Sequence, residues 1–431
     1  MKRRYLFRLL DVVWLAVLAI YVLAGISITP FHGDEAMQIT MSSDYFIAFV
    51  QRQPQALPVT PPYVPDSDAW LRLINGSVNR YGIGLSLHAA GYSSIDLPTL
   101  WQWPLSVEDN MARGSRPSAD VLNVSRISSA LFLALSISVL FAIGGQMGGR
   151  LPAYFASGLY ALNPVVLLNG RRAMMEGSLL FFGLLTIWVA VMVCQERNRW
   201  SWWLLLGVVG GLALASKHSG IVFVVSAWGW ITAVQLIKAT ILHGMRYLLS
   251  RLAVTAVITI AVFIALSPAL WNNPVARLGD LVVERQKLLD SQVVADPNGA
   301  TTMQQRIEGI ITQPFMQPPT YFEAAFWGGS ESVRGEIARY TDSLLGGIQW
   351  STVLGTILTL LSGIGMLFLI RSWRKWQGGM LVWLVITIAS LLVNPLPWQR
   401  YYLPLYPLAA LAVGIGVVYL HGLIYGLRSS T

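Results

Sequence analysis

The amino-acid sequence predicts an all-helical protein that crosses a membrane about ten times. Hydrophobic residues make up 55% of the 431 residues and charged residues only 12%, a composition typical of integral membrane proteins. Long apolar runs recur along the chain, and two polar stretches, 30–126 and 271–349, interrupt them. We therefore expect a single integral membrane domain over residues 1–431 with two long loops.

Ten apolar runs define the predicted spans. The first, 9–29, has the length of roughly 20 residues that one crossing requires, and it exceeds the ~7–15 apolar residues of a signal peptide. The run 201–216 is short, but Lys217 follows it, and Trp202 and Trp203 suit the membrane interface. In chain order the predicted spans are 9–29, 127–146, 152–169, 173–194, 201–216, 218–238, 252–270, 350–370, 378–394 and 402–424.

Positive charge predicts the orientation of these spans. The chain begins with Lys2, Arg3 and Arg4, and the segments expected on the same side carry many basic residues but only Asp11 and Glu196 as acids. Because cytoplasmic loops are enriched in Lys and Arg, both termini are expected in the cytoplasm and both long loops outside it. The net charge of +9 then reflects topology, and we expect no nucleic-acid binding.

Both long loops are expected to contain short helices that lie along the membrane interface. Tyr45, Phe46, Trp70 and Leu71 are among the apolar residues that suit such helices in the first loop. The second loop contains a charged helical stretch over 277–290 and would act as a lid. Loops of this length without a function are uncommon.

Two adjacent carboxylates follow the first span directly. Asp34 and Glu35 stand in the tetrapeptide His32-Gly33-Asp34-Glu35, just past the hydrocarbon region, where the phosphate of a lipid carrier would also lie. Adjacent side chains point in different directions. We therefore expect one carboxylate to face a substrate and the other to anchor the loop.

Short links on the predicted outer side carry unexpected cations. These are Arg171 and Arg172, Lys217 beside His218, and Arg400. Facing carboxylates on an adjoining loop, they would hold a lipid phosphate and stabilise its charge as it leaves. The alternative is that each side chain extends separately to the lipid headgroups.

Glu176 is the acid nearest to these cations in the sequence. It lies four residues after Arg172, so the two side chains would share a face if one helix contained both. A structural ion pair is the alternative to a role in chemistry, because a carboxylate near the membrane needs a partner in either case.

The sequence gives no indication of a metal site or a cofactor. Cys194 is the only cysteine, which excludes a disulfide within the chain and a thiolate cluster. The five histidines are scattered, and no pair has the spacing of metal ligands on one helix.

Four motifs in order resemble those of two families of polyprenyl-phosphate-sugar enzymes. The families are the dolichyl-phosphate-mannose protein mannosyltransferases and the lipid A aminoarabinose transferases, which share the GT-C fold. The matching segments are Phe31-His32-Gly33-Asp34-Glu35-Ala36, 170–182 with Arg171, Arg172 and Glu176, 211–220 with Lys217, and 400–407, which begins Arg400-Tyr401-Tyr402-Leu403-Pro404.

The resemblance implies a GT-C-like fold and a role for each matching residue. Asp34 would be the catalytic base, Glu35 its neighbour in the acceptor site, and Arg171 or Arg172, Lys217 and Arg400 ligands of the carrier phosphate. It also implies inversion at the anomeric carbon without a metal. Glu176, His218 and Tyr401 would support the site. The chain shows no appended soluble domain and is shorter than many members, which leaves the acceptor and the sugar open.

The sequence therefore predicts a membrane glycosyltransferase. It would move a sugar from a polyprenyl-phosphate-linked donor to an extracytoplasmic acceptor, which is a lipid, a glycan or a protein, and it would lie in a bacterial cytoplasmic membrane. One alternative is a transporter or flippase of an anionic lipid-linked substrate, which predicts duplicated halves that this sequence does not show. The other is a non-catalytic membrane scaffold with the same fold.

Overall fold

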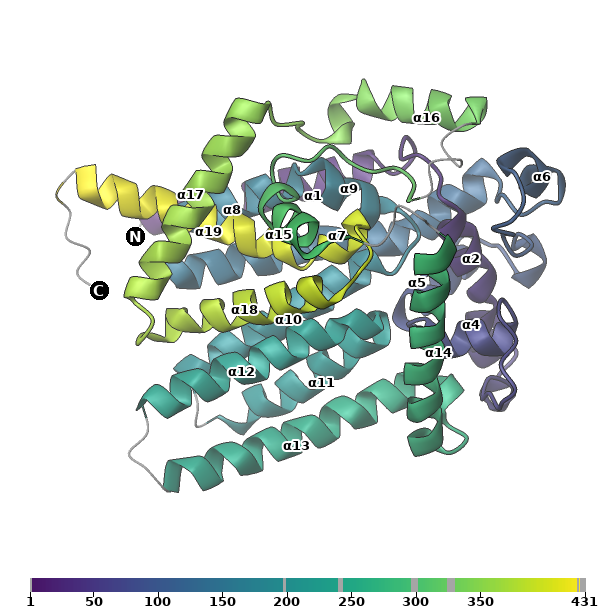
Figure 1. Ribbon diagram of the computed structural model, residues 1–431, viewed down its shortest axis with the longest axis horizontal. Coiled ribbons are helices and arrows are strands. Elements are labelled where there is room, and N and C mark those ends of the chain that lie inside the picture. The colour runs from purple at the N-terminus through teal and green to yellow at the C-terminus, as the bar shows by residue number, and fades with distance from the viewer. Residues whose placement is uncertain are drawn as a thin grey trace.

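The computed structural model describes residues 2–196, 199–238, 243–295, 301–323, 330–424 and 426. Within these residues the secondary structure is helical and contains no strand, so the predicted all-helical class is confirmed (Figure 1). Two parts of the predicted second loop, 296–300 and 324–329, lie outside the described residues.

A bundle of long helices forms the body of the protein, and its members run roughly alongside one another (Figure 1). The helices are α1 (Lys2–Ala24), α7 (Ala119–Gly148), α8 (Arg150–Ala161), α9 (Pro164–Arg171), α10 (Glu176–Gln195), α11 (Trp200–Ser216), α12 (Ile221–Lys238), α13 (His243–Leu266), α17 (Thr352–Arg371), α18 (Gly379–Val393) and α19 (Leu405–Ile424).

The number of spans differs from the predicted ten. Eight helices of the described residues are long and apolar enough to cross a membrane, and a ninth span results if the bent pair α8–α9 is counted as one. The helix α11 is apolar but shorter. Every predicted run contains helix, and the count of ten stays a prediction.

The predicted span 152–169 is broken into two helices, which meet at 63°. Pro164 begins α9, because its fixed φ angle and missing N–H suit the first position of a helix and would interrupt α8. Asn163 caps α9, and its side-chain oxygen accepts from the N–H groups of Val165 and Val166.

Close packing around α10 places the site. Its glycines allow neighbouring helices to approach: a Cβ on Gly177 would lie 2.3 Å from the carbonyl oxygen of Ser129, and one on Gly183 would lie 2.5 Å from Phe223. Small residues at helix contacts are the usual means of close packing within membranes. The start of α10, with Glu176 as its first residue, is thereby held against α7, and the middle of α10 packs against α12.

Shorter helices from both predicted loops gather at one end of the bundle (Figure 1). At the opposite end α1 begins and α19 ends, and α14 crosses the loop end of the bundle against α4 (Figure 1). The shorter elements are α2 (Gly33–Met41), α3 (Ser43–Tyr45), α4 (Asp68–Ile74), α5 (Val78–Ala89), α6 (Val107–Ala112), α14 (Pro274–Ala295), α15 (Met303–Thr312) and α16 (Glu331–Thr341), with short turns at η4 (His218–Gly220), η5 (Pro268–Leu270), η7 (Leu344–Gly346) and η9 (Gln399–Tyr402).

Candidate active site

The two adjacent carboxylates occupy the first turn of α2, which His32 caps. The ring Nδ1 of His32 accepts from the Asp34 N–H at 3.1 Å, and the His32 N–H donates to Glu35 Oε2 at 3.1 Å. This reciprocal pair satisfies free donors at the helix start and fixes the direction of both acids. Glu35 is fully buried, whereas the side chain of Asp34 is partly exposed.

Glu35 anchors α2 to the helix bundle. Arg126 of α7 donates to both of its oxygens, from Nε at 2.7 Å and from Nη2 at 2.8 Å, and the Ala173 N–H donates at 2.9 Å. Burial acts to raise the pKa of Glu35, but Arg126 and these hydrogen bonds outweigh it and hold the pKa below its ordinary value. Glu35 is therefore an ionised carboxylate without a free oxygen.

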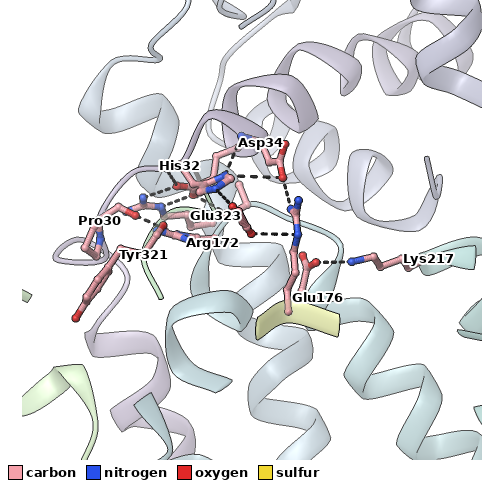
Figure 2. A network of polar contacts seen from close by, with 12 residues as sticks. Pro30, His32, Asp34, Arg172, Glu176, Lys217, Tyr321 and Glu323 are labelled. Atoms are coloured by element: carbon pink, nitrogen blue, oxygen red, sulfur yellow. Dashed lines mark hydrogen bonds and ion pairs between the residues drawn. The ribbon is translucent and has the colours of Figure 1, made fainter. Parts of the chain in front are cut away.

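Asp34 belongs to a closed ring of polar contacts (Figure 2). Arg400 Nη1 donates to Asp34 Oδ2, and Arg400 Nε lies 3.2 Å from Glu323 Oε1. Since Nδ1 of His32 is an acceptor, its Nε2 donates to Glu323 Oε2 at 2.8 Å. The ring thus joins α2, the second loop and η9.

Opposing effects set the pKa values in this ring. Burial acts to raise the pKa of Glu323, but Arg400 and His32 outweigh it and lower the pKa well below the usual range. Burial acts to lower the pKa of Arg400, and the two carboxylates raise it instead.

Glu176 and Lys217 form a second ion pair beside the ring (Figure 2). Lys217 Nζ donates to Glu176 Oε1 at 2.6 Å and lies 5.7 Å from the ring centroid of Tyr401, which stacks on Trp398. Lys217 occupies the break between α11 and η4. The expected shared face of Glu176 and Arg172 is not seen, because Arg172 is extended and α10 begins only at Glu176.

A cavity of about 710 Å³ connects these groups. This volume falls within the range of small-molecule sites. Carboxylates and cations face one another across it, and apolar and aromatic side chains complete its wall. Its lining includes Asp34, Met37, Gln38, Trp70, Trp103, Glu176, Lys217, Arg285, Glu323, Trp398, Arg400 and Tyr401.

Arg171 lies away from this cavity. Its guanidinium donates from Nε to the Val22 carbonyl at 2.8 Å, from Nη2 to the Tyr21 carbonyl at 2.7 Å and from Nη1 to the Tyr340 hydroxyl at 3.3 Å. A Cβ on Gly25 would lie 2.2 Å from the Arg171 Cζ, so any side chain at this position would displace the guanidinium. Arg171 thus ties the end of α1 to the second loop.

Arg172 and His218 are not in the cavity lining either. Arg172 donates from Nε to the Pro30 carbonyl at 3.2 Å and from Nη2 to the Tyr321 carbonyl at 2.9 Å (Figure 2). It therefore joins the segments that precede Asp34 and Glu323. His218 packs edge-on against Phe263 of α13. Of the predicted residues, the structure brings Asp34, Glu176, Lys217, Arg400 and Tyr401 together at the cavity.

The sequence interpretation missed Arg126, Arg285 and Glu323. Arg285 lines the cavity from α14, and among the described residues it has no hydrogen bond or ion pair. Burial and the neighbouring Arg400 act together to lower its pKa. The neighbouring acid Glu284 is already bonded, to Trp70 Nε1 at 3.0 Å and to Lys287 at 2.7 Å.

The described residues contain no group of three or more His, Cys, Asp or Glu arranged to hold a metal ion.

The lowered pKa of Glu323 predicts how stability depends on pH. When the pH falls below the unfolded-state pKa of about 4.3, the unfolded chain binds a proton that folded Glu323 does not, so the free energy of unfolding decreases until the pH passes the folded-state pKa. We expect the thermal midpoint of the purified protein to decrease as the pH is lowered below about 5. In Glu323→Gln the midpoint should decrease less steeply over the same range. Identical slopes from pH 6 to pH 3.5 would contradict this.

A comparison with protein families gives one match. Residues 119–270 match the sequence model of the dolichyl-phosphate-mannose-protein mannosyltransferases. The matched segment runs from α7 to η5 and includes Glu176 and Lys217, but neither Asp34 nor Arg400. No curated protein matches the chain.

Three solved structures share the arrangement of the helices. The oligosaccharyltransferase of Archaeoglobus fulgidus, in the apo form, has a TM-score of 0.54 at 12% identity, over 96% of this chain and 51% of its own. AglB of the same organism, in complex with an inhibitory peptide and a dolichol-phosphate, has a TM-score of 0.53 at 12% identity, over 98% of this chain and 52% of its own. ArnT from Cupriavidus metallidurans, bound to undecaprenyl phosphate, has a TM-score of 0.51 at 11% identity, over 96% of this chain and 61% of its own.

The chain spans about half to three fifths of the length of these structures. At such low identity the likeness establishes the fold alone. The chain therefore has the GT-C fold of membrane glycosyltransferases, with residues 119–270 similar to the dolichyl-phosphate-mannose-protein mannosyltransferases.

Proposed function

We propose that the protein is an inverting glycosyltransferase that moves a sugar from a polyprenyl-phosphate carrier to an extracytoplasmic acceptor. The observation that carries this proposal is the cavity in which Asp34 faces Lys217, Arg285 and Arg400. The neighbours of similar fold support it, since ArnT is bound to undecaprenyl phosphate and AglB to a dolichol-phosphate. The site would face away from the cytoplasm of a bacterial cell membrane.

Asp34 acts as the general base in the proposed reaction. It accepts the proton of an acceptor hydroxyl or amine while that atom forms a bond to the anomeric carbon of the sugar. The bond between this carbon and the phosphate oxygen breaks on the opposite face, which inverts the configuration. The phosphate leaves with the electron pair, and neighbouring cations stabilise its charge.

Arg400 connects the two halves of this reaction. In the structure it is bonded to both Asp34 and Glu323, so its charge is already compensated. A donor phosphate that contacts Arg400 would compete with these carboxylates and weaken its hold on Asp34. Asp34 would thereby become available to the acceptor once the donor is bound.

The second loop covers the segment before Asp34 and would act as a lid. Glu336 of α16 accepts from the Phe31 N–H at 3.0 Å and pairs with Arg116 of the first loop. Opening of the lid would break these contacts together with that of Arg172 to Tyr321. The lid would exclude water while the sugar is transferred.

Arg285 is proposed as the first contact of the donor phosphate, because its charge has no partner. A hydrogen bond to a charged group contributes about 1.5–3 kcal/mol, so Arg285→Ala is expected to weaken binding of polyprenyl phosphate by roughly 10–100-fold. Lys287→Ala is the matched control, because it removes an equal charge from the same helix. Lys287 already pairs with Glu284, so this substitution should weaken binding of polyprenyl phosphate several-fold less than Arg285→Ala does. Affinity is measured by competition with labelled polyprenyl phosphate. Equal losses of affinity in the two variants would show that Arg285 does not bind the phosphate.

The proposed function is tested by the release of the carrier. Purified protein would be incubated with a panel of polyprenyl-phosphate sugars and with membrane extracts that supply acceptors. We expect at least one donor to release polyprenyl phosphate in an acceptor-dependent reaction. Absence of release from every donor, under conditions in which the protein binds polyprenyl phosphate, would contradict the proposal.

A further inference from the structure

A buried arginine without a counterion lies far from the cavity. Arg251 of α13 is only 6% exposed, and it forms no hydrogen bond or ion pair with any residue that the structure describes. Its Nη1 is enclosed and has no partner. Burying a charge without a partner is unfavourable, so this guanidinium requires an anion.

Aromatic rings hold the guanidinium in place. Its Cζ lies 3.6 Å from the ring centroid of Trp200, 4.4 Å from that of Tyr247 and 6.0 Å from that of Trp203. Stacking on aromatic faces stabilises the flat group but leaves its N–H groups unsatisfied. The N–H groups of a guanidinium point along its plane, which is the direction from which the oxygens of a phosphate bind an arginine.

The same place is the N-terminus of α11. Trp200 is the first residue of this 17-residue helix, and no side chain caps it. The first N–H groups of a helix lack partners within it, and the helix dipole favours negative charge there. At about 1.5 Å per residue, this end of α11 lies roughly 25 Å from Lys217 and the cavity.

No nearby acid supplies the missing charge. Glu196 is bonded to Arg199 at 3.0 Å and to Trp202 Nε1 at 3.2 Å. The sequence segments 197–198 and 239–242, which the structure does not describe, contain no Asp or Glu. Since no acid among the described residues pairs with Arg251, we expect the anion to be a separate molecule.

We infer that Arg251 and the N-terminus of α11 bind the phosphate of an anionic phospholipid. Trp and Tyr residues gather where membrane helices meet the headgroups, so Trp200 and Tyr247 indicate the depth at which lipid phosphates lie. The site is separate from the proposed sugar transfer, and the bound lipid stabilises the packing of α11 against α13.

The test measures lipid binding to the delipidated full chain in detergent. Short-chain phosphatidylglycerol is expected to raise the thermal midpoint, short-chain phosphatidylcholine to raise it less, and inorganic phosphate to have little effect. Arg251→Gln should weaken the apparent affinity for phosphatidylglycerol about tenfold or more. If inorganic phosphate raised the thermal midpoint as much as phosphatidylglycerol does, the site would bind a free phosphate ion and not a lipid, and the inference would be overturned.

Two further variants separate the site from general charge effects. Arg246→Gln removes an exposed charge from the same helix and should leave the response to phosphatidylglycerol unchanged. Arg251→Lys keeps the charge but cannot stack on Trp200, so it should bind several-fold more weakly than the wild type, and it covers the case in which Arg251→Gln does not fold. Wild-type affinity in either Arg251 variant, or an equal loss in Arg246→Gln, overturns the inference.

Discussion

Asp34→Asn is expected to abolish sugar transfer while the donor still binds. An amide keeps the shape of the side chain but cannot accept the proton of the acceptor, and loss of a general base lowers turnover by roughly 10²–10⁴-fold. Arg400 keeps Glu323 as its partner after the change, so the ring is weakened rather than removed. Because the substitution removes one of the two carboxylates that compensate the charge of Arg400, the affinity for polyprenyl phosphate should be unchanged or higher.

The measurement combines turnover with donor binding. Asp66→Asn is the matched control, since Asp66 also lines the cavity and is exposed, and this variant should keep most of the activity. Turnover of Asp34→Asn above one tenth of the wild-type value would show that Asp34 is not the base. A transporter or a scaffold would also keep its function in this variant.

Glu35→Gln is expected to produce the largest loss of stability. Removing one partner of a buried ion pair costs about 3–5 kcal/mol, because the other charge stays buried. Arg126 would lose its carboxylate, and an amide nitrogen cannot accept from the N–H groups that now reach Glu35. We expect a large drop in the thermal midpoint and a low yield of folded protein.

The double variant Glu35→Met with Arg126→Met distinguishes the loss of the ion pair from the cost of leaving one buried charge without a partner. It removes both partners, so it should be more stable than the sum of the two single changes predicts. Glu108→Gln changes an exposed acid of the first loop and should leave the midpoint nearly unchanged. Additive effects of the two Met substitutions would show that Glu35 and Arg126 do not act as a pair.

The helices were predictable because their signal is local. An apolar run of about 20 residues has few alternatives to a membrane helix, whatever the rest of the chain does. The helix break at Pro164 could also have been predicted from the sequence, since an Asn-Pro pair inside an apolar run marks the start of a new helix. The motif around Asp34 was visible for a similar reason, because it follows a long apolar run directly.

The partners of each charge were not predictable, because they depend on tertiary contacts. Arg171 and Arg172 are adjacent cations, and only the folded chain shows that they bind backbone carbonyls rather than line the cavity. Glu323 comes from a loop without periodicity. Arg285 lies in an amphipathic stretch whose cavity-facing side became evident only from the position of α14.

The ring of Asp34, His32, Glu323 and Arg400 joins segments that lie far apart in the sequence, and this has a consequence for how the centre assembles. Arg400 follows Asp34 by 366 residues, and Glu323 follows His32 by 291. The ring therefore forms only after the helices between these residues have been synthesised and packed together. A nascent polypeptide that has not yet reached Arg400 lacks the proposed centre.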